Sequence, residues 1–311
     1  MLIQIGIFIV SLSVLLYASR IFTNAAEKIG LLLGLSPFMI GLVIVSVGTS
    51  LPELISGIIA TNAGKSEIAA GNVLGANVSN LLLLLGITTL ASKKTIELGE
   101  TYIFIDLHFM LGSTLMIGLF LWDGTLTWKE GVLLLVGFIL YQIHLLKSEK
   151  VVEKEKQDKA DSKEKIKQVG IMALAGIGVF LGADYTITSI ISISTSLEIN
   201  EAIISATVLS LGTTLPELAV SYSAAKAGKA QIAIGNILGS CIFNSLLVLG
   251  TSSLFGEITL PENMRAFSII FVIGSAVFFY LLSQDKKINK FEGLLFILFY
   301  FTFILKIIGV V

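Results

Sequence analysis

The chain has 311 residues, of which 55% are hydrophobic and 14% charged, and its formal net charge is −1. Soluble domains carry about a quarter charged residues, so this composition, with a mean hydropathy of +0.91, indicates an integral membrane protein. The near-zero net charge and scattered lysines exclude a basic face for nucleic acid. The single cysteine, Cys241, excludes an internal disulfide and a thiolate metal cluster.

Ten apolar stretches follow one another along the chain. In order they are 2–29, 37–61, 68–90, 102–121, 130–146, 168–195, 201–225, 232–254, 265–283 and 292–310. A membrane-spanning helix needs roughly 20 apolar residues, and continuous runs of this length suit helices better than the alternating strands of a barrel. The first run lacks a basic leader and a cleavage site, so we expect a retained span. The predicted fold class is all-α, with ten transmembrane helices.

A charged segment, 147–167, separates the fifth and sixth stretches. It holds eight Lys and six Asp or Glu, which cannot build a core and predict a solvated linker. The linker divides the chain into two five-helix units, 1–146 and 168–311. If the N-terminus is outside, 17 of the 21 Lys and Arg fall on the inner side. The positive-inside rule therefore predicts a multi-pass protein of the cell (plasma) membrane, with both termini extracellular and the linker cytoplasmic.

An internal repeat supports this division. The sequence GTSLPEL at 48–54 recurs as GTTLPEL at 212–218, and GNVLG at 71–75 recurs as GNILG at 235–239, both at an offset of 164 residues. Over 39 aligned positions from the first glycine of each copy, 21 are identical without a gap. Because five is odd, the second unit must cross the membrane in the opposite sense. Such inverted repeats are typical of secondary transporters, whose sites lie near the bilayer midplane.

Each copy of the first motif places a carboxylate, Glu53 or Glu217, near the middle of a predicted span. A charge at this depth costs about 2.5 kcal/mol or more, which favours a functional role. Pro52 and Pro216 precede these acids, lack an N–H group and clash with the carbonyl four residues back. The sequence therefore predicts two oxygen-rich kinks, one beside each glutamate.

The second motif adds amide side chains. Asn236, Ser240 and Asn244 share one helical face. The corresponding face of the first unit carries Asn72, Ala76 and Asn80. We assign Asn80 and Asn244 to the site, and Asn72 and Asn236 to hydrogen bonds between helices. The repeated glycines Gly71, Gly75, Gly235 and Gly239 are expected to let another helix approach closely.

The predicted donors are carboxylate, hydroxyl, amide and carbonyl oxygens. Such hard donors suit Ca²⁺, Na⁺ or Mg²⁺. The two histidines, His108 and His144, lie near span ends, which disfavours a zinc or copper site. Two ionised glutamates are neutralised by one Ca²⁺, by two Na⁺ or by two protons, so competing cations can use one site. The penalty for an unpaired buried charge would then enforce exchange without leak.

With these motifs, the chain resembles the cation/calcium exchanger superfamily, nearest its prokaryotic sodium/calcium exchanger branch. The resemblance covers the whole ten-helix architecture and implies Ca²⁺ efflux driven by Na⁺ influx, typically three Na⁺ for one Ca²⁺. It implies that Glu53 and Glu217, with the carbonyls of Thr49 and Thr213, hold Ca²⁺. Na⁺ would additionally use the side chains of Ser50, Thr214 and Ser240 and the backbone oxygens of Ser46 and Ser210. We expect no enzymatic activity, no resident cofactor and no obligatory protein partner.

Two positions depart from the family pattern. Ala76 stands where many relatives carry Ser, which removes one hydroxyl. Asn244 stands where several relatives, the potassium-dependent ones included, carry Asp, so the site holds two carboxylates and not three. The second departure argues against potassium co-transport. The first and sixth helices also resemble the family's long, tilted pair, which slides past the remaining bundle.

Other functions remain open at the level of sequence. A proton/calcium exchanger would use the same carboxylates, because protons compete for them. A passive cation channel would need a ring of oxygen donors but no inverted symmetry. An intramembrane enzyme would need a nucleophile or an activated-water frame beside the two acids, and the motifs supply neither.

Overall fold

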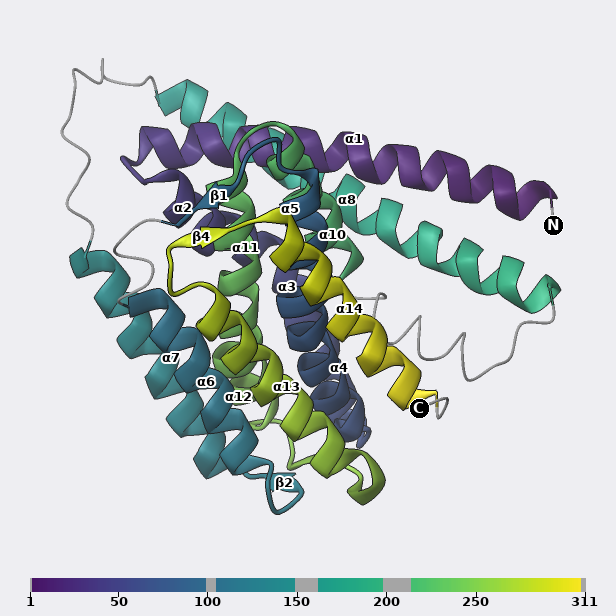
Figure 1. Ribbon diagram of the computed structural model, residues 1–311, viewed down its shortest axis with the longest axis vertical. Helices are drawn as coiled ribbons and strands as arrows, with labels where there is room; N and C mark the ends of the chain where they lie inside the picture. Colours follow the sequence, from purple (N-terminus) through teal and green to yellow (C-terminus); the bar gives the residue numbers. More distant parts are fainter. Residues whose placement is uncertain (1, 99–104, 149–161, 198–213, 309–311) are drawn as a thin grey trace.

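The computed structural model of the protein describes residues 2–98, 105–148, 162–197 and 214–308, and it is almost entirely helical (Figure 1). The first unit contains α1 (Leu2–Leu32), α2 (Pro37–Met39), η1 (Ile40–Val45), α3 (Ser46–Asn62), α4 (Ser66–Val78), η2 (Ser79–Leu84), α5 (Leu85–Ala91), α6 (Leu107–Phe120) and α7 (Trp128–Ser148). The second contains α8 (Ser162–Ser196), α10 (Leu215–Lys226), α11 (Ala230–Ile242), η4 (Phe243–Val248), α12 (Leu249–Ser252), α13 (Glu262–Leu282) and α14 (Lys290–Ile307). The segments labelled η are π-helical.

The helices confirm a multi-pass membrane protein. Within the described ranges, seven helices are long and apolar enough to cross a bilayer, and the shorter α6 is also apolar. Each apolar stretch of the sequence contains a helix, although the stretches 102–121 and 201–225 lie partly outside the described residues. The number of crossings and the inversion of the repeat stay predictions.

The sixth predicted span begins earlier than expected. Helix α8 starts at Ser162, inside the segment predicted as linker. Side-chain pairs one turn apart extend it: Gln168 Nε2 donates to Glu164 Oε1 at 2.6 Å, and Lys167 Nζ lies 3.9 Å from Glu164 Oε2. Such pairs stabilise turns of a helix that have no apolar face to pack against a neighbour.

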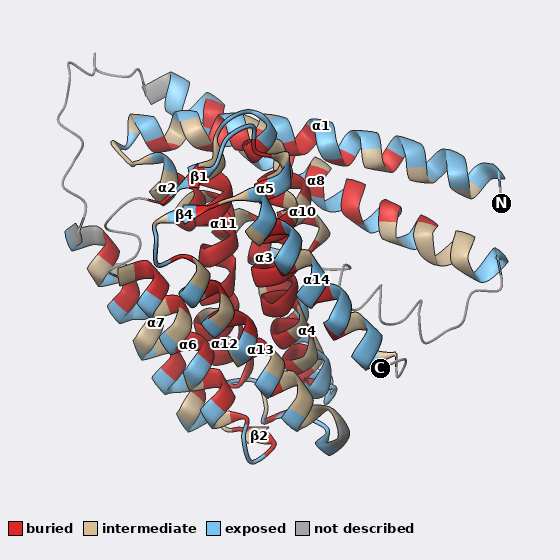
Figure 2. Ribbon diagram, viewed as in Figure 1, coloured by how far each residue is buried: buried red, intermediate tan, exposed pale blue. Residues whose placement is uncertain are grey.

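Two continuous helical stretches form the centre of the molecule. Over a window of 18 residues, 94% of the residues are buried in Ala230–Ser252 and 78% in Ser66–Ala91, against 22% in α1. Figure 2 shows this buried centre surrounded by helices whose outward faces are exposed. Those outward faces carry large apolar side chains such as Leu119, Ile139 and Leu298. An apolar exterior around a well-packed centre is what a lipid environment requires.

Glycine lets the first unit pack directly onto α11. A Cβ atom at Gly235 would lie 2.2 Å from the backbone oxygen of Phe38, and one at Gly41 would lie 2.1 Å from that of Ile232. Gly239 faces Leu42 and Ser46 equally closely, as predicted. The prediction was wrong for Gly71 and Gly75, because a Cβ atom at either would have no described atom within 4 Å outside its own helix turn.

Helices α1 and α8 pack along one another and lie steeply inclined to the central helices (Figure 1). Their contact includes a buried hydrogen bond, in which Thr186 Oγ1 lies 3.0 Å from Ser11 Oγ. At the other end of α1, Lys229 Nζ lies 2.6 Å from Glu27 Oε2 and ties α1 to the turn before α11. A long, tilted pair was the expectation for the first and sixth helices.

Two short antiparallel ladders join the units. Strand β1 (Ile96–Glu97) pairs with β4 (Lys287–Ile288), and β2 (Thr125–Leu126) pairs with β3 (Ile258–Thr259). A shift of 162 residues carries β1 onto β3 and β2 onto β4, and it maps each pairing of one ladder onto a pairing of the other. The ladders are therefore equivalent under exchange of the two units.

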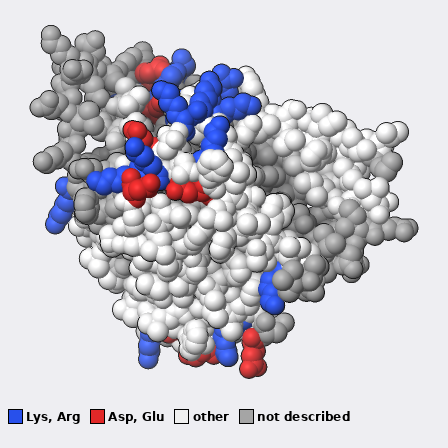
Figure 3. Space-filling model, viewed as in Figure 1, with Lys and Arg blue, Asp and Glu red and all other residues white. Residues whose placement is uncertain are grey.

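Charged side chains leave a broad, largely uncharged band across the face of the molecule that Figure 3 shows. In Figure 3 most Lys and Arg lie at the end where β1 and β4 are found, and a smaller group lies at the opposite end. Exposed Lys93 and Lys94 precede β1, exposed Lys226 ends α10, and exposed Lys287 lies in β4. The band between the two ends has the character of a surface facing lipid.

Candidate cation site

The two predicted carboxylates come from one helix of each unit and are removed from the surface. Glu53 lies in α3 and Glu217 in α10, and their exposed fractions are 0% and 1%. Thr49 and Ser50, which lie about one turn before Glu53 in α3, are also buried. The motif therefore places its polar residues in the interior, where a carboxylate needs polar or ionic compensation.

One contact brings three predicted site residues together. Ser50 Oγ forms hydrogen bonds with Glu217 Oε1 at 3.1 Å and with Ser240 Oγ at 3.0 Å. These residues belong to α3, α10 and α11, and Ser50 lies 167 positions from Glu217 in the chain. The two motif copies thus meet in space and form one site with donors from both units.

A second contact links α3 of the first unit to α11. Thr49 Oγ1 lies 3.2 Å from Asn236 Oδ1 and 3.3 Å from the backbone oxygen of Ser46. Asn236 Nδ2 donates to Ser221 Oγ at 2.9 Å, so both ends of its amide have partners. An amide satisfied in this way matches the structural role predicted for Asn236.

Asn80 and Asn244 occupy equivalent places in two π-helical segments. Each is the second residue of its segment, η2 or η4, and the segments are 164 residues apart. The backbone oxygens of Asn80 and Asn244 accept from the N–H groups of Leu85 and Leu249, five residues on. Sequence reasoning missed these segments, because a π turn has no residue signature of its own. Short π segments inside α-helices are frequent at functional sites.

Several buried polar atoms of the site have no hydrogen-bond partner among the described residues. They are both amide atoms of Asn80, both of Asn244, and Oε2 of Glu217. A buried polar group without a partner costs about 1–3 kcal/mol, and such groups are rare in folded proteins. Their oxygens are therefore suited to coordinate a hard cation.

The remaining predicted residues have different surroundings. The hydroxyl of Ser46 donates to the backbone oxygen of Leu42, one turn earlier, and the predicted ligand role concerns the backbone oxygen of Ser46. Thr214 is buried at the N-terminus of α10. Thr213 and Ser210 lie outside the described residues, so the predicted role of their backbone oxygens is not tested.

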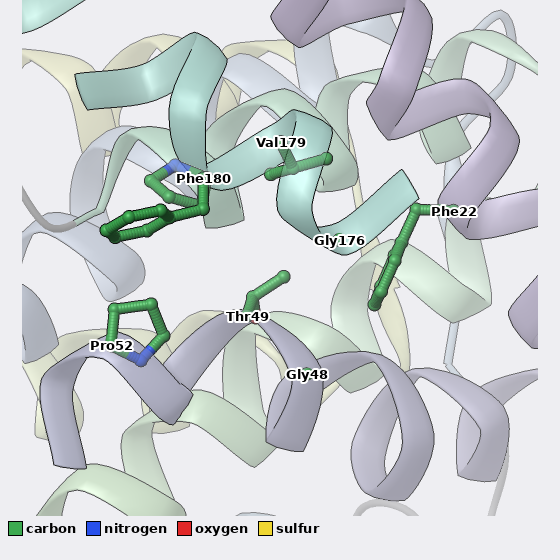
Figure 4. A pocket seen from close by; sticks show the side chains of 8 residues that line it. Phe22, Gly48, Thr49, Pro52, Gly176, Val179 and Phe180 are labelled. Atoms are coloured by element: carbon green, nitrogen blue, oxygen red, sulfur yellow. The ribbon is translucent and has the colours of Figure 1, made fainter. Parts of the chain in front are cut away.

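A small cavity borders both proline-containing turns. Its walls are Phe22, Gly48, Thr49, Pro52, Gly176, Val179, Phe180 and Pro216. Figure 4 shows the side chain of Thr49 directed toward α8, with Phe22 of α1 beside Gly48 and Phe180 of α8 opposite Pro52. Helices α1 and α8 thus cover the place where the two motif copies come together.

The oxygen atoms of the candidate site favour hard cations that are coordinated by few charged side chains. Among the described residues there is no group of three or more His, Cys, Asp and Glu side chains that would hold a metal ion. Two carboxylates must therefore be supplemented by hydroxyl, amide and backbone oxygens. Neutral oxygen donors suit Na⁺ and Ca²⁺ and give no preference to soft metals.

Comparison with known proteins agrees with this chemistry. The family described as "Sodium/calcium exchanger protein" matches residues 3–147 and 167–309. The sodium/calcium exchanger MaX1 of Methanosarcina acetivorans is 29% identical over 339 residues, which cover 96% of each chain. The inner membrane protein YrbG of Escherichia coli is 29% identical, with coverage of 88% of this chain and 87% of that protein. A crystal structure of the sodium–calcium exchanger NCX_Mj, soaked with Na⁺ and Ca²⁺, is 28% identical and matches with a TM-score of 0.82 over 96% of this chain and 97% of that chain.

Proposed function

The chain belongs to the sodium/calcium exchanger family, and on this premise we propose that it expels Ca²⁺ from the cell in exchange for Na⁺ that enters down its gradient. The observation that carries the proposal is the meeting of Ser50, Glu217 and Ser240, buried and within hydrogen-bond distance, from both copies of the motif. A single site built from both units is what a transporter with a midplane site needs.

The site chemistry supports exchange of unlike cations. Glu53 and Glu217 supply two negative charges, which one Ca²⁺ or two Na⁺ neutralise. The neutral oxygens of Ser50, Ser240 and Asn244 lie in the same buried region and add donors for a further Na⁺. A loaded site is then close to neutral and crosses the bilayer readily, whereas the bare site carries an uncompensated charge. Transport is therefore coupled to exchange.

An inverted repeat of two five-helix units supports the same proposal. The β1·β4 and β2·β3 ladders map onto one another under a shift of 162 residues, and η2 maps onto η4 under a shift of 164. In Figure 1 the two ladders lie at opposite ends of the bundle. Equivalent features at opposite ends are expected from units of opposite orientation.

The distribution of charge gives the proposed topology. The end with most Lys and Arg would face the cytoplasm, together with the linker 147–167, and both termini would be extracellular. Expulsion of Ca²⁺ places the protein in the cell membrane. In this arrangement ten helices cross the bilayer, five in each unit.

The deciding experiment uses purified protein in proteoliposomes. Vesicles loaded with Na⁺ and diluted into choline medium should take up ⁴⁵Ca²⁺, and replacement of internal Na⁺ by choline at fixed pH should abolish uptake. Empty vesicles and the Glu217→Gln variant serve as controls. Uptake that persists without Na⁺ and follows an imposed pH gradient would establish a proton/calcium exchanger instead.

A further inference from the structure

One buried amide side chain close to the site was not predicted from the sequence. Asn77 lies in α4, three residues before Asn80, and its exposed fraction is 0%. Its Nδ2 donates to Ser245 Oγ at 2.8 Å and to the backbone oxygen of Cys241 at 3.4 Å. Because a backbone oxygen only accepts, the contact with Cys241 fixes which end of the amide faces α11.

Both partners of Asn77 are immediate neighbours of site residues. Cys241 follows Ser240, whose hydroxyl bonds Ser50, and Ser245 follows Asn244 in η4. A bond to these neighbours constrains the rotation of α11 and η4. It therefore constrains where the oxygens of Ser240 and Asn244 lie relative to the glutamates.

The position of Asn77 in the repeat is also special. Cys241 is the residue equivalent to Asn77, 164 positions later. Residues related by a two-fold axis touch each other only on that axis, so Asn77 lies where the two units meet. The residues equivalent to Asn77 and Ser245 are Cys241 and Leu81, which cannot form the same bond in the reverse direction. An amide bridge that runs in one direction only thus joins the two units at the axis.

We propose that Asn77 is a positioning residue of the transport site, which sets the placement of Ser240 and Asn244 through its bonds to Cys241 and Ser245. The inference rests on the proposed function of this site. We expect Asn77 to affect the binding of Na⁺ more than the binding of Ca²⁺, because Ser240 and Asn244 are neutral donors. The glutamates carry most of the attraction for Ca²⁺. Partners that orient metal ligands typically change metal affinity 10- to 100-fold when they are removed.

The test compares Asn77→Leu, Ser245→Ala and the double variant with the wild-type protein. Ser113→Ala is the matched control, since Ser113 is also buried and bonds a backbone oxygen, but lies in α6. Binding of ⁴⁵Ca²⁺ to purified protein is measured at increasing Na⁺, together with the thermal midpoint. We expect Asn77→Leu to raise the half-inhibiting Na⁺ concentration about tenfold and to change Ca²⁺ affinity at zero Na⁺ less than about threefold. Ser245→Ala should shift the half-inhibiting Na⁺ concentration in the same direction. The shift in the double variant should be no larger than the shift in Asn77→Leu.

An exchange of the two side chains gives a rescue test. The double variant Asn77→Ser with Ser245→Asn restores an amide–hydroxyl pair across the axis and should recover most of the Na⁺ dependence. If Asn77→Leu does not fold, the inference is tested with Ser245→Ala and with the exchanged pair. An unchanged Na⁺ dependence in Ser245→Ala, or equal shifts in Ser113→Ala, would overturn the inference. Failure of the wild-type protein to exchange Na⁺ for Ca²⁺ would instead refute the proposed function. This exchange is measured separately, by ⁴⁵Ca²⁺ uptake into proteoliposomes.

Discussion

The two carboxylate oxygens of Glu217 have different surroundings. One carboxylate oxygen, Oε1, accepts from Ser50, while Oε2 has no hydrogen-bond partner among the described residues. A carboxylate held at one oxygen keeps a fixed orientation and presents the other oxygen to a ligand. Ser50 is itself held by Ser240, so the orientation of Glu217 depends on a residue of α11.

The two glutamates should be individually essential. Glu53→Gln and Glu217→Gln each remove half of the negative charge and preserve the shape of the side chain. We expect a loss of about 3 kcal/mol in Ca²⁺ binding, which is about 100-fold in affinity. The measurement is equilibrium ⁴⁵Ca²⁺ binding and uptake, with the exposed Glu97→Gln as control. Near-normal uptake by either variant would show that the site lies elsewhere.

Asn244 offers a second test at the level of one residue. Asn244→Asp adds a third carboxylate beside a buried pair, so the Ca²⁺-loaded site becomes negative unless the new acid is protonated. We expect roughly tenfold slower Ca²⁺ exchange at neutral pH, because the loaded site then crosses the bilayer with an uncompensated charge. Mild acidification protonates the new acid and should restore part of the rate. A pH profile identical to that of the wild type would count against a place for Asn244 in the site.

At the scale of elements, π-helical segments and β-ladders organise the fold. Segments η2 and η4 begin four residues after the last glycine of the G-N-x-L-G motifs and change the helical register, so the residues beyond them face different neighbours than an α-helix would give. The ladders fix the loops between helices at both ends of the bundle. Neither feature follows from hydropathy, since two-residue strands and π turns leave no periodic pattern.

The ladder register predicts a specific cross-link. Thr125 and Thr259 are direct partners in the β2·β3 ladder. Opposed residues of an antiparallel pair have Cα atoms about 4.5–5.5 Å apart, which is within the range of a disulfide. Thr125→Cys with Thr259→Cys, in a Cys241→Ala background, should therefore oxidise rapidly and shift mobility on a gel after cleavage between the two units. Leu126→Cys with Thr259→Cys is the control, because its side chains lie on opposite faces, and equally fast oxidation of this pair would contradict the register.

At the scale of the whole molecule, the helices and the meeting of the two motifs were predictable from the sequence, because apolar length and exact repetition carry that information. The link from Thr49 to Asn236 and the bridge made by Asn77 were not, since each joins residues more than 160 positions apart through the packing of several helices. Gly235 and Gly239 were predicted as contact points, but the partner segment, 38–46, could be identified only in three dimensions.

Topology can be tested by labelling from either side of the membrane. Exposed Lys94 lies just before β1, and exposed Lys129 lies in the first turn of α7, just after β2; β1 and β2 are at opposite ends of the bundle (Figure 1). In intact cells, an impermeant thiol reagent should label a Lys129→Cys variant and should label a Lys94→Cys variant only after permeabilisation, both in a Cys241→Ala background. Labelling of both variants in intact cells would contradict the proposed topology, in which the chain crosses the membrane between these two positions.

The charge carried in each cycle depends on how many ions the whole molecule exchanges. If three Na⁺ enter for one Ca²⁺ expelled, one net positive charge moves inward, and a negative cell interior aids expulsion by about 2.3 kcal/mol per 100 mV. In proteoliposomes loaded with Na⁺ the cycle runs in reverse, so Ca²⁺ uptake moves one positive charge outward. Uptake should then accelerate when external K⁺ and valinomycin make the interior positive, and it should slow when internal K⁺ makes the interior negative. A rate independent of the K⁺ gradient would indicate exchange of two Na⁺ for one Ca²⁺, in which the two glutamates alone set the stoichiometry and the neutral oxygens of Ser50, Ser240 and Asn244 hold no third ion.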